Sequence, residues 1–182
     1  ELITLKPDLV RIYPTLIIKD TYLEKLYKSG EYTPVTVEEA VDICSLLLIV
    51  FELNNIEVIR VGLQPTENIN DDSEEVVGGP FHPSFRQLVE SKIYEMILIE
   101  ALDKIEIKSK YIKININKKE ISNIVGQKSI NIETIRERYK LKKVSTIGLD
   151  MPKNYFYIID NDNKYKIIRK EYLMPLMKKL SD

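Results

Sequence analysis

The side chains that most often do chemistry are scarce in this chain of 182 residues, which contains one cysteine, Cys44, and one histidine, His82. A single cysteine excludes an internal disulfide and any cysteine-only iron–sulfur site, and a single histidine excludes a multi-histidine metal site. Cys44 lies in an apolar stripe with helical spacing, which predicts a core position rather than a reactive thiol. The sequence therefore predicts no metal site and no catalytic residue within this chain.

A short basic turn is the clearest candidate for binding chemistry. Gly126-Gln-Lys-Ser129 separates two segments with helical patterns, and further basic residues flank it on both sides: Lys118, Lys119, Arg136 and Arg138. Together these cations would supply the salt-sensitive attraction to phosphates that nucleic-acid binders need. Gly126 alone is equally explained as the C-cap of a helix.

Charge divides the chain into two modules. Residues 1–104 contain 9 Lys and Arg against 19 Asp and Glu, a net charge of −10, whereas residues 105–182 contain 18 against 9, a net charge of +9. An AT-rich genome would enrich lysine in both halves, so it does not explain the basic half alone. We therefore expect two domains, 1–104 and 105–182, with different partners.

The cellular setting follows from composition. No apolar run reaches the roughly 18 residues of a membrane span, so no membrane partner is expected. The lack of paired cysteines indicates a cytoplasmic protein.

The first module has the pattern of an α/β fold. Leu9–Tyr13 predicts a short strand, and Thr36 and Glu39 have capping-box spacing at the start of a helix over residues 37–54. The nearly continuous apolar run Ile56–Leu63 predicts a second strand, parallel to the first through a right-handed βαβ crossover. A polar loop over residues 65–75 and a helix over residues 84–103 follow.

Five segments of this module together resemble the C-terminal part of radical SAM proteins related to the catalytic subunit of Elongator: Val10–Thr21, Leu26–Pro34, Glu38–Ala40, Ile59–Gln64 and Gly79–Phe85. Oxygen-independent coproporphyrinogen oxidases resemble the first segment more distantly. The resemblance covers about residues 1–100. It implies the C-terminal strands and helices of a partial TIM barrel. It also implies an enzyme that cleaves S-adenosylmethionine at a [4Fe–4S] cluster, with the wobble uridine of tRNA as substrate in Elongator-type members.

This chain departs from the family because the three-cysteine cluster motif is absent and no acetyltransferase domain is recognisable. Three thiolates are the usual minimum for anchoring such a cluster. We therefore expect the chain to be a fragment that is not catalytic by itself. Its partner would be the missing N-terminal barrel portion of the same protein, which would hold the cofactors.

Barrel strands carry functional side chains at their carboxyl ends. On this basis the candidates for lining the substrate or cofactor cavity are Tyr13, Thr15, Arg60, Gln64 and His82. Arg60 interrupts an apolar strand and either faces solvent or serves a site. His82 lies between two prolines in a turn, where a histidine is more often structural than catalytic. Edge packing explains Tyr13 and Thr15 at least as well.

The second module has a different order of elements. The pattern predicts strands over residues 111–117, 144–147 and 155–159, helices over residues 118–125 and 132–139, and a final helix that reaches residue 180. Asn131 is expected to cap the second helix. Lys164–Ile168 either extends the sheet or opens the last helix.

This βααββα order, an α+β fold, resembles a type I KH domain, and Ile124–Ile132 is similar to its signature turn. KH domains clamp about four nucleotides of single-stranded RNA or DNA. The resemblance implies RNA contacts at the turn and beside it: Lys118, Lys119, Gly126, Gln127, Lys128, Ser129 and Arg136. Ser129 stands where the family has a glycine, which would hinder phosphate approach.

Three functions remain open. In the first, the chain is the C-terminal region of a radical SAM enzyme that acts on RNA, and the KH-like module holds the tRNA. Alternatively, it is a non-catalytic RNA-binding module, or part of a radical SAM enzyme that acts on a small molecule of the tetrapyrrole type. The co-occurrence of the two resemblances favours the first, because the third leaves the basic module unexplained.

Overall fold

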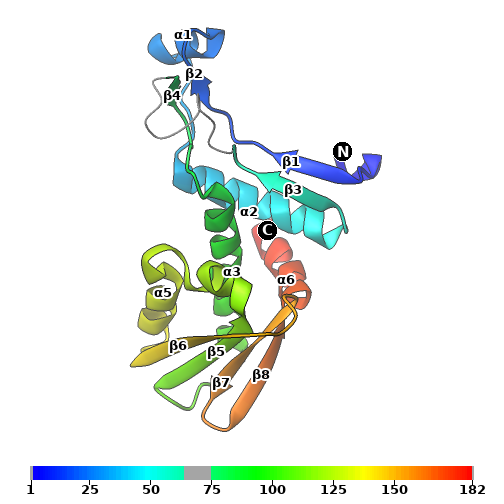
Figure 1. The fold of residues 1–182 in the computed structure, drawn as a ribbon, viewed down its shortest axis with the longest axis vertical. Coiled ribbons are helices and arrows are strands. Elements are labelled where there is room, and N and C mark those ends of the chain that lie inside the picture. The colour runs from blue at the N-terminus through cyan, green and yellow to red at the C-terminus, as the bar shows by residue number, and fades with distance from the viewer. Residues whose placement is uncertain (1, 64–74, 182) are drawn as a thin grey trace. The chain divides into compact units, whose positions relative to one another are not determined.

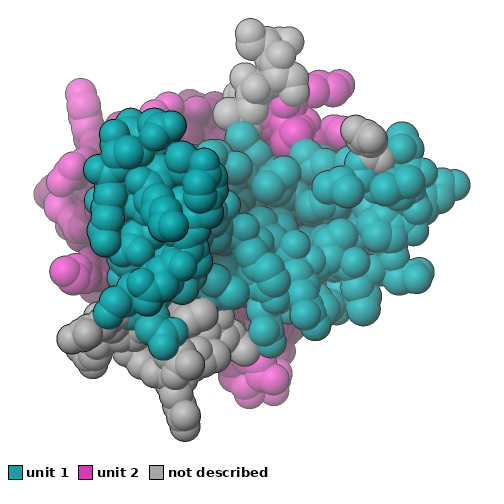
Figure 2. Space-filling view, turned by 90° about the horizontal axis from the view of Figure 1, so that it is seen from above, with its two compact units in different colours: residues 1–89 teal, residues 90–182 magenta. Residues whose placement is uncertain are grey.

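The structure of the chain is a computed structural model that describes residues 2–63 and 75–181. The chain forms two compact units, residues 1–89 and 90–182, which Figure 2 shows in different colours. The division falls within α3 (Phe85–Lys104), so each unit contains part of this helix. A domain boundary after residue 104 remains a prediction. No helix in the described part of the chain has the length and apolar character to cross a membrane.

Unit 1 is built on a βαβ element. β1 (Leu9–Ile12) and β3 (Glu57–Val61) pair in parallel, and α2 (Val37–Leu53) connects them (Figure 1). The predicted capping box is present, because the Glu39 amide donates to Thr36 Oγ1 and the Thr36 amide donates to Glu39 Oε2. The predicted parallel crossover is confirmed.

The rest of unit 1 consists of short elements. A 3-10 turn η1 (Leu2–Leu5) precedes β1, and β2 (Ile17–Ile18) pairs with β4 (Val76–Gly78) in an antiparallel two-stranded sheet. The helix α1 (Tyr22–Lys28) follows β2. Gly62, with φ +78°, lies where an added Cβ would approach Phe85 Cβ to 2.7 Å, so only glycine lets β3 approach the start of α3 this closely.

Unit 2 contains a four-stranded sheet in the order β6-β5-β7-β8. Its strands are β5 (Tyr111–Asn117), β6 (Lys143–Leu149), β7 (Tyr155–Asp160) and β8 (Asn163–Ile168). β5 and β6 are parallel, and the other two pairs are antiparallel. The segment 164–168 therefore extends the sheet, which settles the alternative left open by the sequence.

The helices of unit 2 cover one face of this sheet. They are η2 (Lys118–Glu120), α4 (Ile121–Val125), η3 (Gln127–Ser129), α5 (Ile130–Arg138) and α6 (Arg169–Ser181), together with the end of α3. Figure 1 shows α3, α5 and α6 on the same side of the sheet. Side chains from the covered face and the helices form the core: Tyr94, Ile112, Ile114, Ile116, Ile124, Ile135, Phe156, Ile158, Ile167 and Leu173.

Both units mix helices with small sheets, as the predicted α/β and α+β classes require. The partial TIM barrel and the KH-like fold remain predictions. The expectation that Asn131 caps the second helix is wrong: α5 begins at Ile130, and Asn131 lies in its first turn with its side chain buried.

Candidate functional site

The basic turn of unit 2 has an unusual backbone. Gly126 ends α4 with φ +78°, and its amide donates to Ser122 O. Lys128 and Ser129 follow with φ +49° and +64°, so two successive non-glycine residues adopt the left-handed conformation. Each such residue costs about 1–2 kcal/mol, so surrounding contacts must hold the turn in this shape.

Those contacts come from the buried side chain of Asn131. Its Nδ2 donates to Ser91 O at 2.9 Å and lies 3.3 Å from Ile124 O, which joins α5 to α3 and to the end of α4. A Cβ added to Gly126 would lie 3.0 Å from Asn131 Oδ1 and 2.8 Å from Ile130 Cγ2. Because the space beneath the turn is filled, the glycine is required and the turn is fixed.

The fixed turn leaves Gln127, Lys128 and Ser129 at the surface. Ser129 is the N-cap of α5, but its side chain makes no capping hydrogen bond, so it leaves the first-turn amides uncapped. Such amides attract anions. Glu133 in the same turn of the helix weakens this attraction.

The predicted cations around the turn are not equivalent. Lys119 and Lys128 are exposed and make no ion pair with described residues. Lys118 Nζ lies 3.4 Å from Asp150 Oδ2, and both side chains are largely exposed, so this pair contributes little and exchanges easily for a phosphate.

Arg136 and Arg138 are held by carboxylates. Arg136 Nε donates to Glu133 Oε2 at 2.8 Å, and this hydrogen bond raises the pKa of Arg136. Arg138 Nη2 lies 3.4 Å from Asp103 Oδ2. A carboxylate already offsets part of the charge of each arginine, which makes Lys128 and Lys119 the better candidates for a phosphate contact.

Three of the predicted cavity residues of unit 1 line two separate pockets. Tyr13 and Thr15 line a mostly apolar pocket of about 160 Å³, together with residues of α2 that include Cys44. Arg60 lines another pocket, of about 230 Å³, between the end of β3 and the start of α3, where Ser84, Arg86 and Gln87 also contribute. Arg86 Nη1 donates to Val58 O at 2.9 Å, so this side chain connects the start of α3 to β3 beside the pocket.

His82 lines neither of these pockets. His82 Nδ1 accepts a hydrogen bond from the Ser84 amide at 3.0 Å, and its carbonyl accepts from the Phe85 amide. These bonds shape the turn before α3. Gln64 lies outside the described residues.

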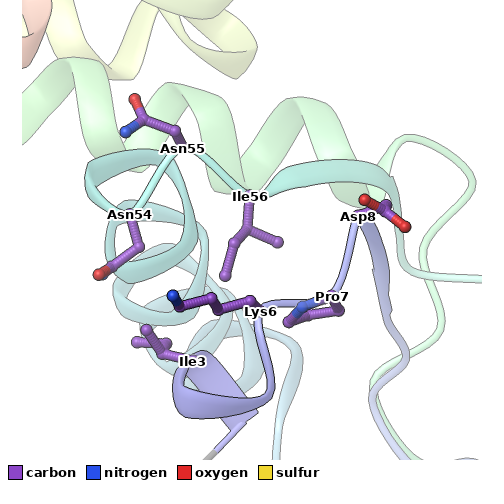
Figure 3. A pocket seen from close by; sticks show the side chains of 7 residues that line it. All are labelled: Ile3, Lys6, Pro7, Asp8, Asn54, Asn55 and Ile56. Atoms are coloured by element: carbon purple, nitrogen blue, oxygen red, sulfur yellow. The ribbon is translucent and has the colours of Figure 1, made fainter.

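A third pocket, of about 400 Å³, lies near the N-terminus (Figure 3). Asp8 and Ile56, which precede β1 and β3, both line it. It is therefore at the amino ends of the parallel strands, whereas α/β folds bind ligands at the carboxyl ends. Of the predicted cavity residues that the structure describes, none lines it.

Side chains missed by the sequence analysis project from the uncovered face of the unit 2 sheet. Lys164 Nζ lies 3.9 Å from the ring centroid of Tyr157, and Lys166 Nζ lies 4.3 Å from that of Tyr155. The two tyrosine rings meet edge to face, with centroids 5.5 Å apart. The alternation of Tyr in 155–159 and of Lys in 164–168 was the available signal, but only the β7–β8 register brings the two types together.

The residues present do not suit an iron–sulfur cluster. Cys44 is the single thiol, and it is 3% exposed. Burial raises its pKa to about 11, which disfavours the thiolate that a cluster needs. No group of three or more His, Cys, Asp or Glu in residues 2–63 and 75–181 could hold a metal ion. A cluster would need thiolates from outside this chain.

Comparison with known proteins supports one of the two resemblances. Residues 7–95, just under half of the chain, match the Radical_SAM C-terminal domain. The tRNA uridine(34) acetyltransferase of Methanocaldococcus jannaschii is 52% identical over 40 residues, which cover 22% of this chain and 7% of that protein. The enzyme of the same name from Methanocaldococcus infernus is 46% identical over 39 residues, which cover 21% of this chain and 7% of that protein. The matched stretches thus span a small part of these relatives. No solved structure matches the chain.

Proposed function

Because residues 7–95 carry a radical SAM C-terminal domain, we propose that this chain works as part of a cytoplasmic radical SAM enzyme that modifies tRNA at uridine 34. The observation that carries the proposal is the domain match together with two relatives named for that nucleoside. The domain implies S-adenosylmethionine and a [4Fe–4S] cluster, whose thiolate ligands this chain would receive from elsewhere. Its own residues contribute binding surfaces.

Unit 1, in this proposal, is the end of a partial TIM barrel. The support is its incomplete sheet, since β1 pairs with β3 alone among the described strands. Parallel sheets are normally covered on both faces and extend over more strands. Leu9, Ile59 and Ile43 are each 41% exposed or more, which leaves apolar surface for further strands or helices to cover.

The Arg60 pocket would then receive an anionic group of the substrate or cofactor, since it lies at the carboxyl end of β3. Tyr13 and Thr15 would line a separate, mostly apolar pocket. His82 would keep the turn before α3 in place.

Unit 2 would hold the RNA through its KH-like turn. The support is the glycine-led turn between two helices in a βααβ order, with Lys128 exposed at its centre and Lys119 exposed on η2. Ser129 adopts the left-handed conformation, with φ +64°, which a glycine would adopt at lower steric cost. Its side chain would hinder phosphate approach more than a glycine would.

RNA binding tests the role of unit 2. The full chain should shift a single-stranded RNA of 12 nucleotides in gels at low salt, and the affinity should fall as salt rises. Lys128→Ala with Lys119→Ala should weaken binding. It should also reduce the slope of the logarithm of the binding constant against the logarithm of the salt concentration by about 0.7 for each phosphate contact that is lost. The exposed pair Lys25→Ala with Lys178→Ala is the matched control. No binding at low salt would contradict the proposal.

Nucleoside analysis tests the role in modification. In cells that lack this protein, tRNA should lose one modified uridine at position 34, and the intact gene should restore it. Unchanged tRNA nucleosides together with altered tetrapyrroles would instead support the small-molecule alternative.

A further inference from the structure

The uncovered face of the unit 2 sheet has the composition of a surface for single-stranded nucleic acid. The pairing register places on this face the side chains of the odd-numbered residues of β5, β6 and β7 and of the even-numbered residues of β8. Four of them are lysines, three are tyrosines, and none carries a carboxylate. The acidic side chain of β7, Asp160, is buried on the other face.

From this juxtaposition we propose that the sheet face formed by β5, β6, β7 and β8 binds a single-stranded RNA segment, with bases stacked on Tyr155 and Tyr157 and phosphates held by the lysines. The inference rests on the proposed function, and it adds a second RNA surface to the basic turn. Sheets and grooves that bind single strands combine aromatic platforms with cations in this way.

The tyrosines are positioned for stacking. They lie two residues apart on β7, so both rings project from one face, and their edge-to-face contact fixes them relative to each other. Tyr157 lies opposite Asn115 on β5. Asn115 Oδ1 is buried and makes no hydrogen bond with the described residues, so it is an acceptor that a base N–H beside Tyr157 would satisfy.

The lysines occupy the rings in the absence of RNA. An ammonium over an exposed ring gains about two- to fivefold in an equilibrium constant, whereas a base stacked on an aromatic ring gains about five- to hundredfold. A base therefore displaces Lys164 or Lys166 from its ring. The released ammonium remains on the neighbouring strand, within reach of the phosphate attached to that base.

An RNA occupant is favoured over a protein by charge and composition. Lys113, Lys143, Lys164 and Lys166 lie on three of the four strands of this face, and no acidic side chain on it neutralises them. The exposed apolar side chains Ile147 and Leu149 lie on β6, where they extend the surface available to a splayed base.

The experiment uses the full chain with fluorescent oligouridine of 12 nucleotides and with the abasic ribose-phosphate strand of the same length. Tyr155→Ala and Tyr157→Ala should each weaken oligouridine binding at least fivefold and leave the weaker abasic binding unchanged. Tyr155→Phe and Tyr157→Phe should bind as the native chain does, because they keep the ring. Tyr22→Ala, at a tyrosine that is 74% exposed on α1, is the control.

A spectroscopic readout keeps the test independent of stability. The chain contains no tryptophan, so Tyr157→Trp introduces a single reporter. Oligouridine should quench its fluorescence in a saturable way, and it should leave Tyr22→Trp unquenched. Urea unfolding of each variant confirms that it folds.

The outcomes separate the two RNA surfaces. If oligouridine binds and Lys128→Ala with Lys119→Ala weakens it, but the alanine variants of the tyrosines bind normally and Tyr157→Trp is not quenched, the sheet proposal is wrong and the proposed function survives. If the native chain binds no RNA, both are wrong. If the tyrosine variants change only self-association of the protein, the face is a protein interface and the sheet proposal is wrong.

Discussion

The two units differ in how far the chain itself completes them. In unit 2, one face of a four-stranded sheet is covered by helices, and large side chains such as Phe156 and Ile114 are almost inaccessible. In unit 1, two separate two-stranded sheets carry exposed apolar residues, including Leu9 at 52% and Ile59 at 41%. Unit 2 also exposes apolar residues such as Ile147 and Leu149, but Leu9 and Ile59 lie on β1 and β3, which pair only with each other among the described strands. If unit 1 is the end of a partial barrel, as proposed above, further strands or helices complete it, whereas unit 2 has a core of its own.

The two regions also differ in charge. The acidic excess lies before residue 105 and the basic excess lies after it. In unit 2 the cations gather at the basic turn and on the open sheet face, whereas the arginines of α5 are paired with carboxylates. The two proposals, completion of a barrel and binding of RNA, therefore concern different units.

The largest expected effect tests the closed core. Phe156 is 1% exposed, and its ring centroid lies 6.1 Å from that of Tyr94. Phe156→Ala should lower the free energy of unfolding by about 3–5 kcal/mol, because it removes a large buried ring and leaves a cavity. Ile59→Ala in unit 1 should cost less than about 1 kcal/mol, since that side chain is already half in solvent. Urea unfolding of the full chain measures both, and equal losses would remove the contrast between the units.

The next largest effect on the free energy of unfolding is expected from replacing one glycine in each unit. Gly126 in unit 2 and Gly30 in unit 1 have nearly the same φ, +78° and +79°, but a Cβ at Gly126 meets three side chains and a Cβ at Gly30 meets nothing within 4 Å. Gly30→Ala should cost about 1 kcal/mol from the backbone alone. Gly126→Ala should cost about 2–4 kcal/mol, because steric overlap adds to the backbone term.

Chemical denaturation of the two variants separates the cost of the backbone conformation from the cost of steric overlap. Equal losses of unfolding free energy would show that the space beneath the turn relaxes, and that Asn131 does not fix the turn.

The role of Asn131 could not be predicted from the sequence. Short-range patterns predicted the capping box of α2, the buried Cys44 and the parallel pairing of β1 with β3, because each depends on residues that are close in sequence or on periodicity. An asparagine near a helix start has the same local pattern whether it caps the helix or anchors a turn. Its hydrogen bond to Ser91, 40 residues away, decides the matter and leaves no local signal.

The candidate sites show the same difference between local patterns, which can be predicted, and contacts between distant residues, which cannot. The basic turn was predicted because its residues are contiguous. The sheet face was missed because Tyr157 and Lys164 meet only across a strand pair whose register the sequence does not fix. Likewise Tyr13 and Arg60 were grouped as lining one cavity, and the structure places them in different pockets of unit 1.

A smaller effect concerns the buried thiol of unit 1. Burial raises the pKa of Cys44 to about 11, so the folded state favours the protonated thiol. This contribution is complete below the pKa of the unfolded thiol, about 9, and is lost as pH rises toward 11. The free energy of unfolding should fall by about 2 kcal/mol more in the native chain than in Cys44→Ala between pH 8 and pH 11. Urea unfolding at a series of pH values measures the difference. An equal fall in both would show that water reaches Cys44 and that the core of unit 1 is open there.

The smallest expected change in stability tests the exposed apolar surface of unit 1. Ile43 and Leu47 lie one helical turn apart on α2, border the pocket that contains Tyr13, and are 50% and 40% exposed. Ile43→Gln with Leu47→Gln should change the free energy of unfolding by no more than about 0.5 kcal/mol, because little burial is lost. It should nevertheless reduce the binding of a hydrophobic dye to the full chain, since this patch is apolar surface that a barrel would cover. Ile147→Gln with Leu149→Gln, on the open sheet face of unit 2, is the matched control. If that control reduces dye binding as much, exposed apolar surface is common to both units and no longer marks unit 1 as the incomplete one.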